Sequence, residues 1–359
     1  KSAASDVPRI DFSDSTNGAL LLEPQSTNLV TYSSDFSGYI KSGINIVSNI
    51  ATSPDGTVNA TSLTNTNTGQ AHIRTSFVAA STGNYTGTSY IKKQDFDFIY
   101  VEFGNAFCWF NISNGTLGNS GNFGSGWTFI SHSIESVAND WYRISITANN
   151  TITGTYNFRP YQPTSANASY TSGSLGNSFI WGVQVEQNSF STSIIPTSGS
   201  ATTRLADVCN NSGSAQDFNS EEGVLYAEIS ALADDGTYRQ ILLHDNAYVD
   251  RIALRYMPTS NQINVYLING TPQVDFTYNL SSTLDFIKIA FKYKQNDFSL
   301  WVNGIEVGVD TSGTTFSANT LQKIDFDFTN NYFFYGNIKD LQVFTEAKSD
   351  EFLAALTTI

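Results

Sequence analysis

The run IKIAFKY, residues 287–293, decides how this chain folds. Isoleucine, phenylalanine and tyrosine at the odd positions alternate with lysine or alanine at the even ones. A period of two is that of a β-strand with one face toward a core and one toward water. The run INVYL, residues 263–267, alternates in the same way. Both runs therefore predict antiparallel strands with one covered face.

Two asparagine-glycine pairs mark tight turns beside these strands. Asn269-Gly270 and Asn303-Gly304 fit the type I′ turn, because both of its central residues need a positive φ. The second pair joins the apolar run 298–302 to 305–307 and predicts a hairpin there.

Short apolar runs separated by Gly, Asn, Ser and Thr clusters continue along the whole chain, whereas helical spacing is nearly absent. The single helix expected covers 349–356, where Ser349 can cap the N-terminus. The fold class predicted is all-β, with two antiparallel sandwich (jelly-roll) domains in tandem and a short C-terminal helix. The expected strands are 44–50, 72–79, 85–92, 98–103, 107–112, 127–134, 141–148, 155–161 and 179–186, then 224–229, 239–244, 251–257, 263–268, 286–293, 298–302, 323–328 and 337–344.

The length of 359 residues suits two sandwiches of ~100 to 200 residues each. The chain is 40% hydrophobic and only 14% charged, so it can form packed cores. Small polar residues between Ser191 and Asp217 mark the boundary. We expect an N-terminal arm at 1–24, with its apolar run 19–22 as an edge strand or a docking segment. A jelly-roll domain is expected at 25–205, a linker at 206–222 and a second sandwich at 223–359.

The net charge of −14 repels nucleic acid and anionic membranes, so neither is an expected partner. Nine basic residues lie on each side of Leu205, against twelve acidic residues before it and twenty beyond, so the acidity is concentrated in the C-terminal part. No apolar run is long enough for a membrane span, and no signal peptide is visible. A first residue other than Met indicates a fragment of a longer chain. Cys108 and Cys209 fall in different expected domains, so no disulfide is predicted.

Several motifs of the first domain resemble a jelly-roll module of phage and prophage tail-fibre or head-fibre proteins. They appear in the order expected of that module: LLEPQSTNL (21–29), YSSDF (32–36), NDWYRI (139–144), IWGVQVE (180–186) and IPTSGSATTRLADV (195–208).

The second domain resembles the concanavalin A-like/laminin-G sandwich that often follows this module. The resemblance rests on AFKYKQNDF (290–298), VNG (302–304) and GNIKDL (336–341). It implies a receptor-binding fibre protein, located in the virion or at the cell surface if the source is bacterial, and trimeric at full length. Many members of both folds bind carbohydrate, although neither fold fixes a function.

Aromatic residues gather around the Gly/Asn-rich stretch 111–126 of the first domain. Sugars stack on flat rings while amides and hydroxyls bond their hydroxyl groups, so we expect ligand contacts here, with burial in the core as the alternative reading. The candidate ligand-binding residues are Trp109, Phe110, Trp127 and Tyr161.

A second candidate site is expected where strands 239–244 and 251–257 meet. Arg251 and Arg255 offer guanidinium groups that fit a sugar carboxylate or hydroxyl. His244 and Tyr256 complete this group of ligand candidates, and a solvated strand face is the alternative reading.

Three acidic pairs, Asp95/Asp97, Asp234/Asp235 and Asp325/Asp327, are candidate calcium ligands. None has the twelve-residue calcium-loop pattern, so we expect no cofactor, with a structural calcium ion as the alternative. The histidines lack a second ligand at zinc spacing.

The sequence contains no nucleophile elbow, phosphate loop or acid pair typical of glycoside hydrolysis, so we expect a protein that is not an enzyme. The predicted function is recognition of a bacterial surface polysaccharide. Two alternatives stay open: a polysaccharide depolymerase whose Tyr, Arg and His converge only in space, and a purely structural virion decoration protein.

Overall fold

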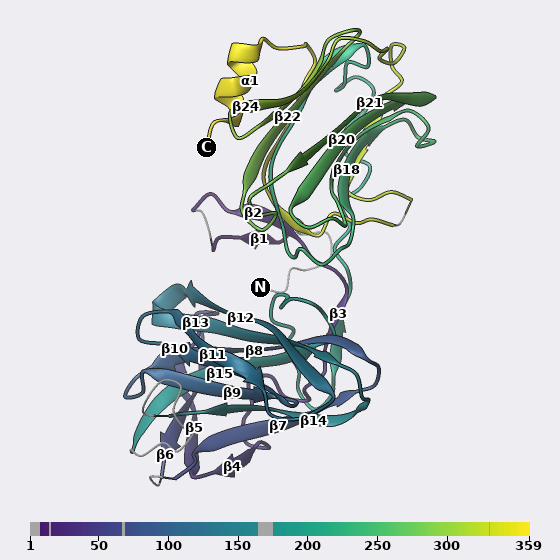
Figure 1. Cartoon of the computed structure of the whole chain (residues 1–359). Helices are drawn as coiled ribbons and strands as arrows, with labels where there is room; N and C mark the ends of the chain where they lie inside the picture. Colours follow the sequence, from purple (N-terminus) through teal and green to yellow (C-terminus); the bar gives the residue numbers. More distant parts are fainter. Residues whose placement is uncertain (1–7, 14–15, 67–68, 164–174, 330) are drawn as a thin grey trace. The chain divides into compact units, whose positions relative to one another are not determined.

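The computed structural model describes residues 8–13, 16–66, 69–163, 175–329 and 331–359 (Figure 1). The chain forms two compact units. Unit one is Gln25–Leu205, and unit two combines residues 8–24 with Ala206–Ile359. The chain therefore begins unit two, builds unit one and then returns to unit two.

All strand pairings within the described residues are antiparallel, and α1 (Asp350–Thr357) is the one α-helix among them. The all-β prediction is confirmed. Ser349 caps α1 by accepting a hydrogen bond from the backbone of Phe352, as its position in the sequence indicated.

Unit one is a sandwich of two six-stranded sheets. The first has the order β11-β10-β9-β14-β7-β4 and the second β12-β13-β8-β15-β6-β5. A short pair, β3 with β16, lies beside them. The bounds are β3 (Ser26–Asn28), β4 (Ile40–Ser42), β5 (Ile44–Thr52), β6 (Val58–Asn65), β7 (His72–Ala79), β8 (Gly83–Lys93), β9 (Phe98–Phe103), β10 (Ala106–Asn111), β11 (Thr116–Asn122), β12 (Trp127–Val137), β13 (Trp141–Asn150), β14 (Gly154–Tyr161), β15 (Gly176–Glu186) and β16 (Thr202–Arg204).

Rings from both sheets fill the core of unit one. Phe103 stacks on Phe77 with centroids 5.3 Å apart, and Trp127 meets Phe103 edge to face at 5.2 Å. Gly87 on β8 leaves space for this packing, because a Cβ there would lie 2.7 Å from the ring of Phe158.

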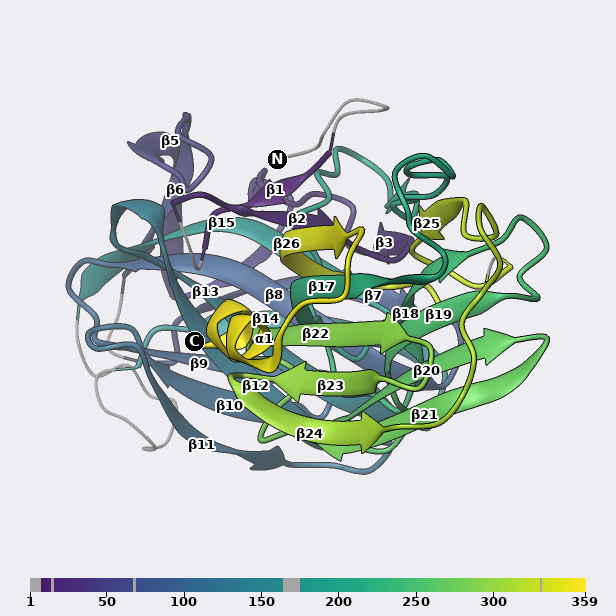
Figure 2. The same ribbon diagram turned by 90° about the horizontal axis from the view of Figure 1, so that it is seen from above.

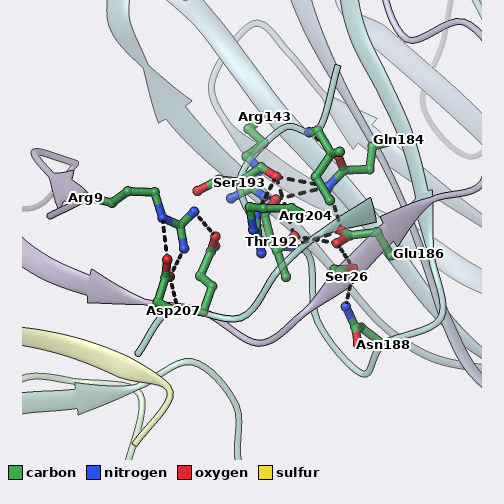
Figure 3. A network of polar contacts seen from close by, with 12 residues as sticks. Arg9, Ser26, Arg143, Gln184, Glu186, Asn188, Thr192, Ser193, Arg204 and Asp207 are labelled. Atoms are coloured by element: carbon green, nitrogen blue, oxygen red, sulfur yellow. Dashed lines mark hydrogen bonds and ion pairs between the residues drawn. The ribbon is translucent and has the colours of Figure 1, made fainter. Parts of the chain in front are cut away.

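The last residue of β15, Glu186, is a fully enclosed carboxylate (Figure 3). It accepts hydrogen bonds from Ser26, from Gln184 and from both the backbone and the hydroxyl of Thr192. Gln184 in turn accepts from the backbone of Ile195 at 2.6 Å. The motifs that resemble the fibre module therefore hold segments of the fold together.

Unit two has a seven-stranded sheet, β1-β2-β26-β17-β22-β23-β24, and a five-stranded sheet, β21-β20-β19-β18-β25. The bounds are β1 (Ile10–Asp11), β2 (Ala19–Leu22), β17 (Glu222–Ala231), β18 (Arg239–His244), β19 (Arg251–Tyr256), β20 (Gln262–Asn269), β21 (Thr271–Asn279), β22 (Ile287–Lys294), β23 (Phe298–Val302), β24 (Ile305–Asp310), β25 (Lys323–Asp325) and β26 (Gly336–Phe344).

The alternation along β22 matches the two faces of its sheet. Ile287, Ile289 and Phe291 are buried in the main core of unit two. The alternation predicted that the opposite face is exposed to solvent. The structure shows that α1 covers part of it, because α1 lies against β22 and β23 (Figure 2). Leu353 of α1 packs there with Ala290 in a smaller apolar cluster.

The two predicted type I′ turns differ in the structure. Asn303 and Gly304 have φ values of 50° and 83°, which confirms the prediction. At the other pair only Gly270 has a positive φ. A register shift between Leu267 and Ile268 changes the geometry of that hairpin, so the type I′ prediction there is wrong.

The segment expected to be an arm contributes two strands to unit two. Leu20 of β2 pairs with Ile338 of β26, near the other end of the chain. Arg9 anchors this segment through ion pairs with Glu23, at 2.5 Å, and with Asp207 (Figure 3). The Arg9 side chain is only 7% exposed, so these ion pairs are largely shielded from water.

The stretch expected to be a linker also joins this core. Phe218 is buried in the main cluster of unit two, and Ser212 forms a backbone bridge with Ile324. Cys108 and Cys209 are both free.

Candidate functional site

Two of the aromatic candidates in unit one point into its core. Phe110 is 1% exposed and Trp127 is 2% exposed. Trp127 contacts the rings of Tyr85 and Tyr156 at 5.8 and 4.9 Å. These side chains hold the two sheets together and present no surface to a ligand in this conformation.

The other two candidates of unit one belong to a cluster on the sheet that contains β10, on the face that points away from the core. Trp109 and Tyr161 each pack against Tyr100, with ring centroids 4.9 and 5.3 Å apart. All three rings are less than 5% exposed. We call Tyr100, Trp109 and Tyr161 the tyrosine–tryptophan cluster.

Charged side chains border this cluster. The hydroxyl of Tyr161 donates to Glu102 at 3.0 Å and accepts from Arg159 at 3.0 Å, while Arg159 also pairs with Glu102 at 2.6 Å. Burial raises the pKa of the Tyr161 hydroxyl to about 12. Burial also raises the pKa of Glu102, although Arg159 and Tyr161 oppose that effect.

Histidine 72 completes the group of polar side chains at this cluster. The rings of His72 and Tyr161 lie 4.6 Å apart. Burial, followed by the charges of Arg159 and Arg74, lowers the pKa of His72 to about 4. Tyrosine, arginine and histidine therefore do converge in space, as a lyase would need. The Tyr161 side chain is nevertheless enclosed, so a substrate does not reach its hydroxyl in this conformation.

In unit two, Arg251 and Arg255 lie on the face of the five-stranded sheet that points away from the core. They flank Ala253 on β19, and Ala253 pairs with Tyr266 of β20. Side chains two residues apart share one face of a strand, so the Tyr266 ring lies between the two arginines. The guanidinium carbons of Arg251 and Arg255 are 5.5 and 4.6 Å from the centroid of that ring.

Further rings border the two arginines. Phe328 lies 5.3 Å from the guanidinium of Arg251, and Tyr238 lies 5.1 Å from that of Arg255. Such cation–π contacts hold an arginine in place without neutralising its charge. With Tyr248, which contacts Phe328 edge to face at 5.5 Å, these residues define a surface. We call it the arginine–tyrosine surface: Tyr238, Tyr248, Arg251, Arg255, Tyr266 and Phe328.

Both arginines keep part of their hydrogen-bonding capacity free. Arg251 donates from Nε to the Tyr266 hydroxyl and from Nη1 to the carbonyl oxygens of Tyr248 and Val249. Arg255 donates from Nε to Asn264 at 2.9 Å. Within the described residues, Nη2 of Arg251 and both terminal nitrogens of Arg255 have no partner, and neither arginine forms an ion pair.

The two remaining candidates of unit two are buried. Tyr256, 2% exposed, lies in the core, and its hydroxyl donates to the carbonyl oxygen of Ile229. Burial raises the pKa of Tyr256 far above its ordinary value. His244 is fully enclosed beneath Tyr248 and contacts Asp325 at 3.0 Å. Both therefore lie behind the surface and do not form part of it.

Sequence reasoning missed four members of this surface. Tyr266 could have been found, because the alternation in 263–267 puts it on the face opposite the core. Tyr238, Tyr248 and Phe328 lie outside the regular strands, where no periodicity indicates which way a side chain points.

The acidic pairs make contacts within the protein. Asp325 accepts from the backbone of Asn211 and from the Tyr248 hydroxyl, and Asp327 accepts from Asn210. Asp234 accepts from Ser260 and Asn261. In the part of the chain that the structure describes, no three His, Cys, Asp or Glu residues group as metal ligands. None of the described helices is long and apolar enough to cross a membrane.

No protein-family model matches the chain, and no curated protein matches its sequence. Solved structures do resemble it. The CBM40 domain of the Ruminococcus gnavus IT-sialidase is 15% identical over 43% of this chain and 96% of that one, with a TM-score of 0.36. Domains LG4-5 of the mouse laminin alpha1 chain are 10% identical over 97% of this chain and 96% of theirs, with a TM-score of 0.28.

Sheep galectin-11, in a complex with glycerol, is 8% identical over 38% of this chain and 96% of its own, with a TM-score of 0.26. All three similarities have TM-scores below 0.5.

Proposed function

We propose that this chain is a non-catalytic binding module that recognises bacterial surface polysaccharide through the arginine–tyrosine surface of unit two. The observation that carries the proposal is the pair Arg251 and Arg255. Aromatic rings hold both in place, and their outer N–H groups have no partner within the described residues. Rings and directed polar groups side by side are the combination that sugar recognition needs.

We further propose, from the motifs of unit one, that the chain belongs to a tail or head fibre of a phage. Its location would then be the virion, and its full-length form a homotrimer. Light scattering on this chain tests whether the residues present here are sufficient for a trimer.

A glycan array carrying capsule and lipopolysaccharide oligosaccharides tests the binding proposal. We expect the wild-type chain to bind a subset of these glycans and the double variant R251A/R255A to lose that signal. The matched control is K294A/K348A, which also removes two positive charges from unit two but leaves the five-stranded sheet unchanged. Equal binding by wild type and R251A/R255A would rule out this surface.

The depolymerase alternative has one observation in its favour, the convergence of His72, Arg159 and Tyr161 in unit one. Incubating the chain with each bound polysaccharide separates the two functions. A binding module leaves the polymer intact, whereas a lyase produces unsaturated, ultraviolet-absorbing ends. Turnover that disappears in Y161F would replace the binding proposal with the enzymatic one.

The structural-decoration alternative predicts no role for these side chains. If R251A/R255A virions attach to host cells as well as wild-type virions do, the chain serves assembly and not recognition.

A further inference from the structure

We infer that the glycan recognised at the arginine–tyrosine surface is an acidic one, whose carboxylate groups are bound by Arg251 and Arg255. The inference rests on the proposed function and names the class of sugar. A neutral sugar needs donors and acceptors in similar number. The two guanidiniums supply donors only, and each carries a permanent positive charge.

The charge of the surroundings also favours an acidic ligand. The residues after Leu205 have a net charge of −11, so positive side chains without a carboxylate partner are unusual in this unit. Asp275, which pairs with Tyr266 across the sheet, accepts from Asn264 and forms no ion pair with Arg255. Leaving two arginines unneutralised among so many acids favours a site that receives its negative charge from a ligand.

The same acidity limits how much charge the ligand can carry. A densely sulfated or phosphorylated polymer would be repelled by the rest of the unit, whereas a sugar acid carries one charge per residue. A carboxylate also matches the planar fork of a guanidinium with two parallel hydrogen bonds. The free terminal nitrogens of Arg255 and Nη2 of Arg251 are the donors available for such bonds.

The Tyr266 ring adds an aromatic group to the two guanidiniums of the site. It lies between the two guanidiniums, in contact with both. A sugar chain that runs from Arg251 past Tyr266 to Arg255 would bring its substituents toward both guanidiniums. The site therefore fits a chain of sugars that carries acid groups on more than one residue.

Nuclear magnetic resonance of the arginine Nε–H groups in the full chain tests the inference. The probes are trisaccharides of galacturonate, glucuronate, mannuronate and N-acetylneuraminate, each with its carboxyl-reduced counterpart, and dextran sulfate. We expect at least one sugar acid to shift the Arg251 and Arg255 signals. Its reduced counterpart should bind on the order of tenfold more weakly, because charge-assisted hydrogen bonds are lost.

The variant R251K/R255K keeps both charges but lacks the forks, so it should bind the sugar acid more weakly than wild type while K294A/K348A binds normally. Equal binding of a sugar acid and its reduced form would overturn the inference. So would tighter binding of dextran sulfate, or unchanged arginine signals with all four acids.

Failure of this inference and failure of the proposed function are distinguishable. A neutral glycan that binds wild type but not R251A/R255A leaves the binding function standing and removes the acidic ligand. An array with no signal for any glycan removes both.

Discussion

The imidazole of His244 lies stacked against the phenol ring of Tyr248, with centroids 4.2 Å apart and planes 14° from parallel. Asp325 contacts both residues, Nε2 of His244 at 3.0 Å and the Tyr248 hydroxyl at 2.9 Å. The pair connects the buried interior of unit two to the arginine–tyrosine surface, because Arg251 donates to the Tyr248 carbonyl oxygen.

The first prediction concerns Asp325. In D325N one acceptor oxygen becomes an amide NH₂, so either the Asn211 amide or the Tyr248 hydroxyl faces a donor, and unit two should lose about 3 kcal/mol of unfolding free energy. Binding at the surface should weaken as well, since Tyr248 loses its anchor. Calorimetry measures the first effect and glycan titration the second. The exposed Asp297 is the control: D297N should cost less than about 1 kcal/mol. An unchanged transition in D325N would contradict this role.

The second prediction concerns the pH dependence of unit one. The pKa of His72 is lowered from 6.5 to about 4 in the folded chain, so the unfolded chain binds the proton more readily. The stabilising contribution is complete above pH 6.5 and is lost as the pH falls from 6.5 to about 4. The variant H72F keeps a ring beside Tyr161 and should remove this part of the acid sensitivity. Tryptophan fluorescence measures the unfolding of unit one at each pH, because Trp109, Trp127, Trp141 and Trp181 lie in unit one.

A third prediction separates rings that build the core from rings at the surface. Trp127 is enclosed between the sheets, so W127A should destabilise unit one by about 3–5 kcal/mol. Phe123 is 54% exposed, and F123A should change the stability by less than about 0.5 kcal/mol. Denaturant unfolding of both variants provides the comparison, and similar losses for the two would refute the assignment.

The fourth prediction concerns Arg9. Replacing it in R9M leaves Glu23 and Asp207 without their shared cation, so unit two should lose about 3 kcal/mol or more. R9K keeps the charge but lacks the planar guanidinium, so its unfolding free energy should lie between those of R9M and wild type. The measurement is the thermal transition of unit two, with K294A as an exposed control. If R9M unfolds like wild type, these ion pairs do not hold the N-terminal strands.

Local patterns were sufficient to predict the fold class, the hairpin at Asn303-Gly304 and the helix capped by Ser349. Among the strands that escaped prediction are the edge strands β11 and β21, which were missed for a physical reason. β11 has the composition of a loop, and β21 begins with Thr271-Pro272, yet each pairs with one neighbouring strand. The pairing of β2 with β26 depends on residues far apart in the chain, which no local periodicity reveals.

The candidate site was predictable only in part. Arg251 and Arg255 could be recognised because they lie four residues apart, and so on one face, in a strand whose other residues are mainly apolar. The depth of a side chain on the polar face of a sheet depends on what covers it, so the burial of His244, Trp109 and Tyr161 could not be read from spacing.

The pairing of Leu22 with Gly336 can form only after most of the chain has been synthesised. At about 5–20 residues per second, a ribosome needs roughly 15 to 60 s to make the chain between them. During that time unit one can fold, while the apolar strand Ala19–Leu22 has already emerged without its neighbour. During this delay the exposed strand Ala19–Leu22 can bind a chaperone. It can also pair with β26 of another chain that is being made on the same messenger RNA.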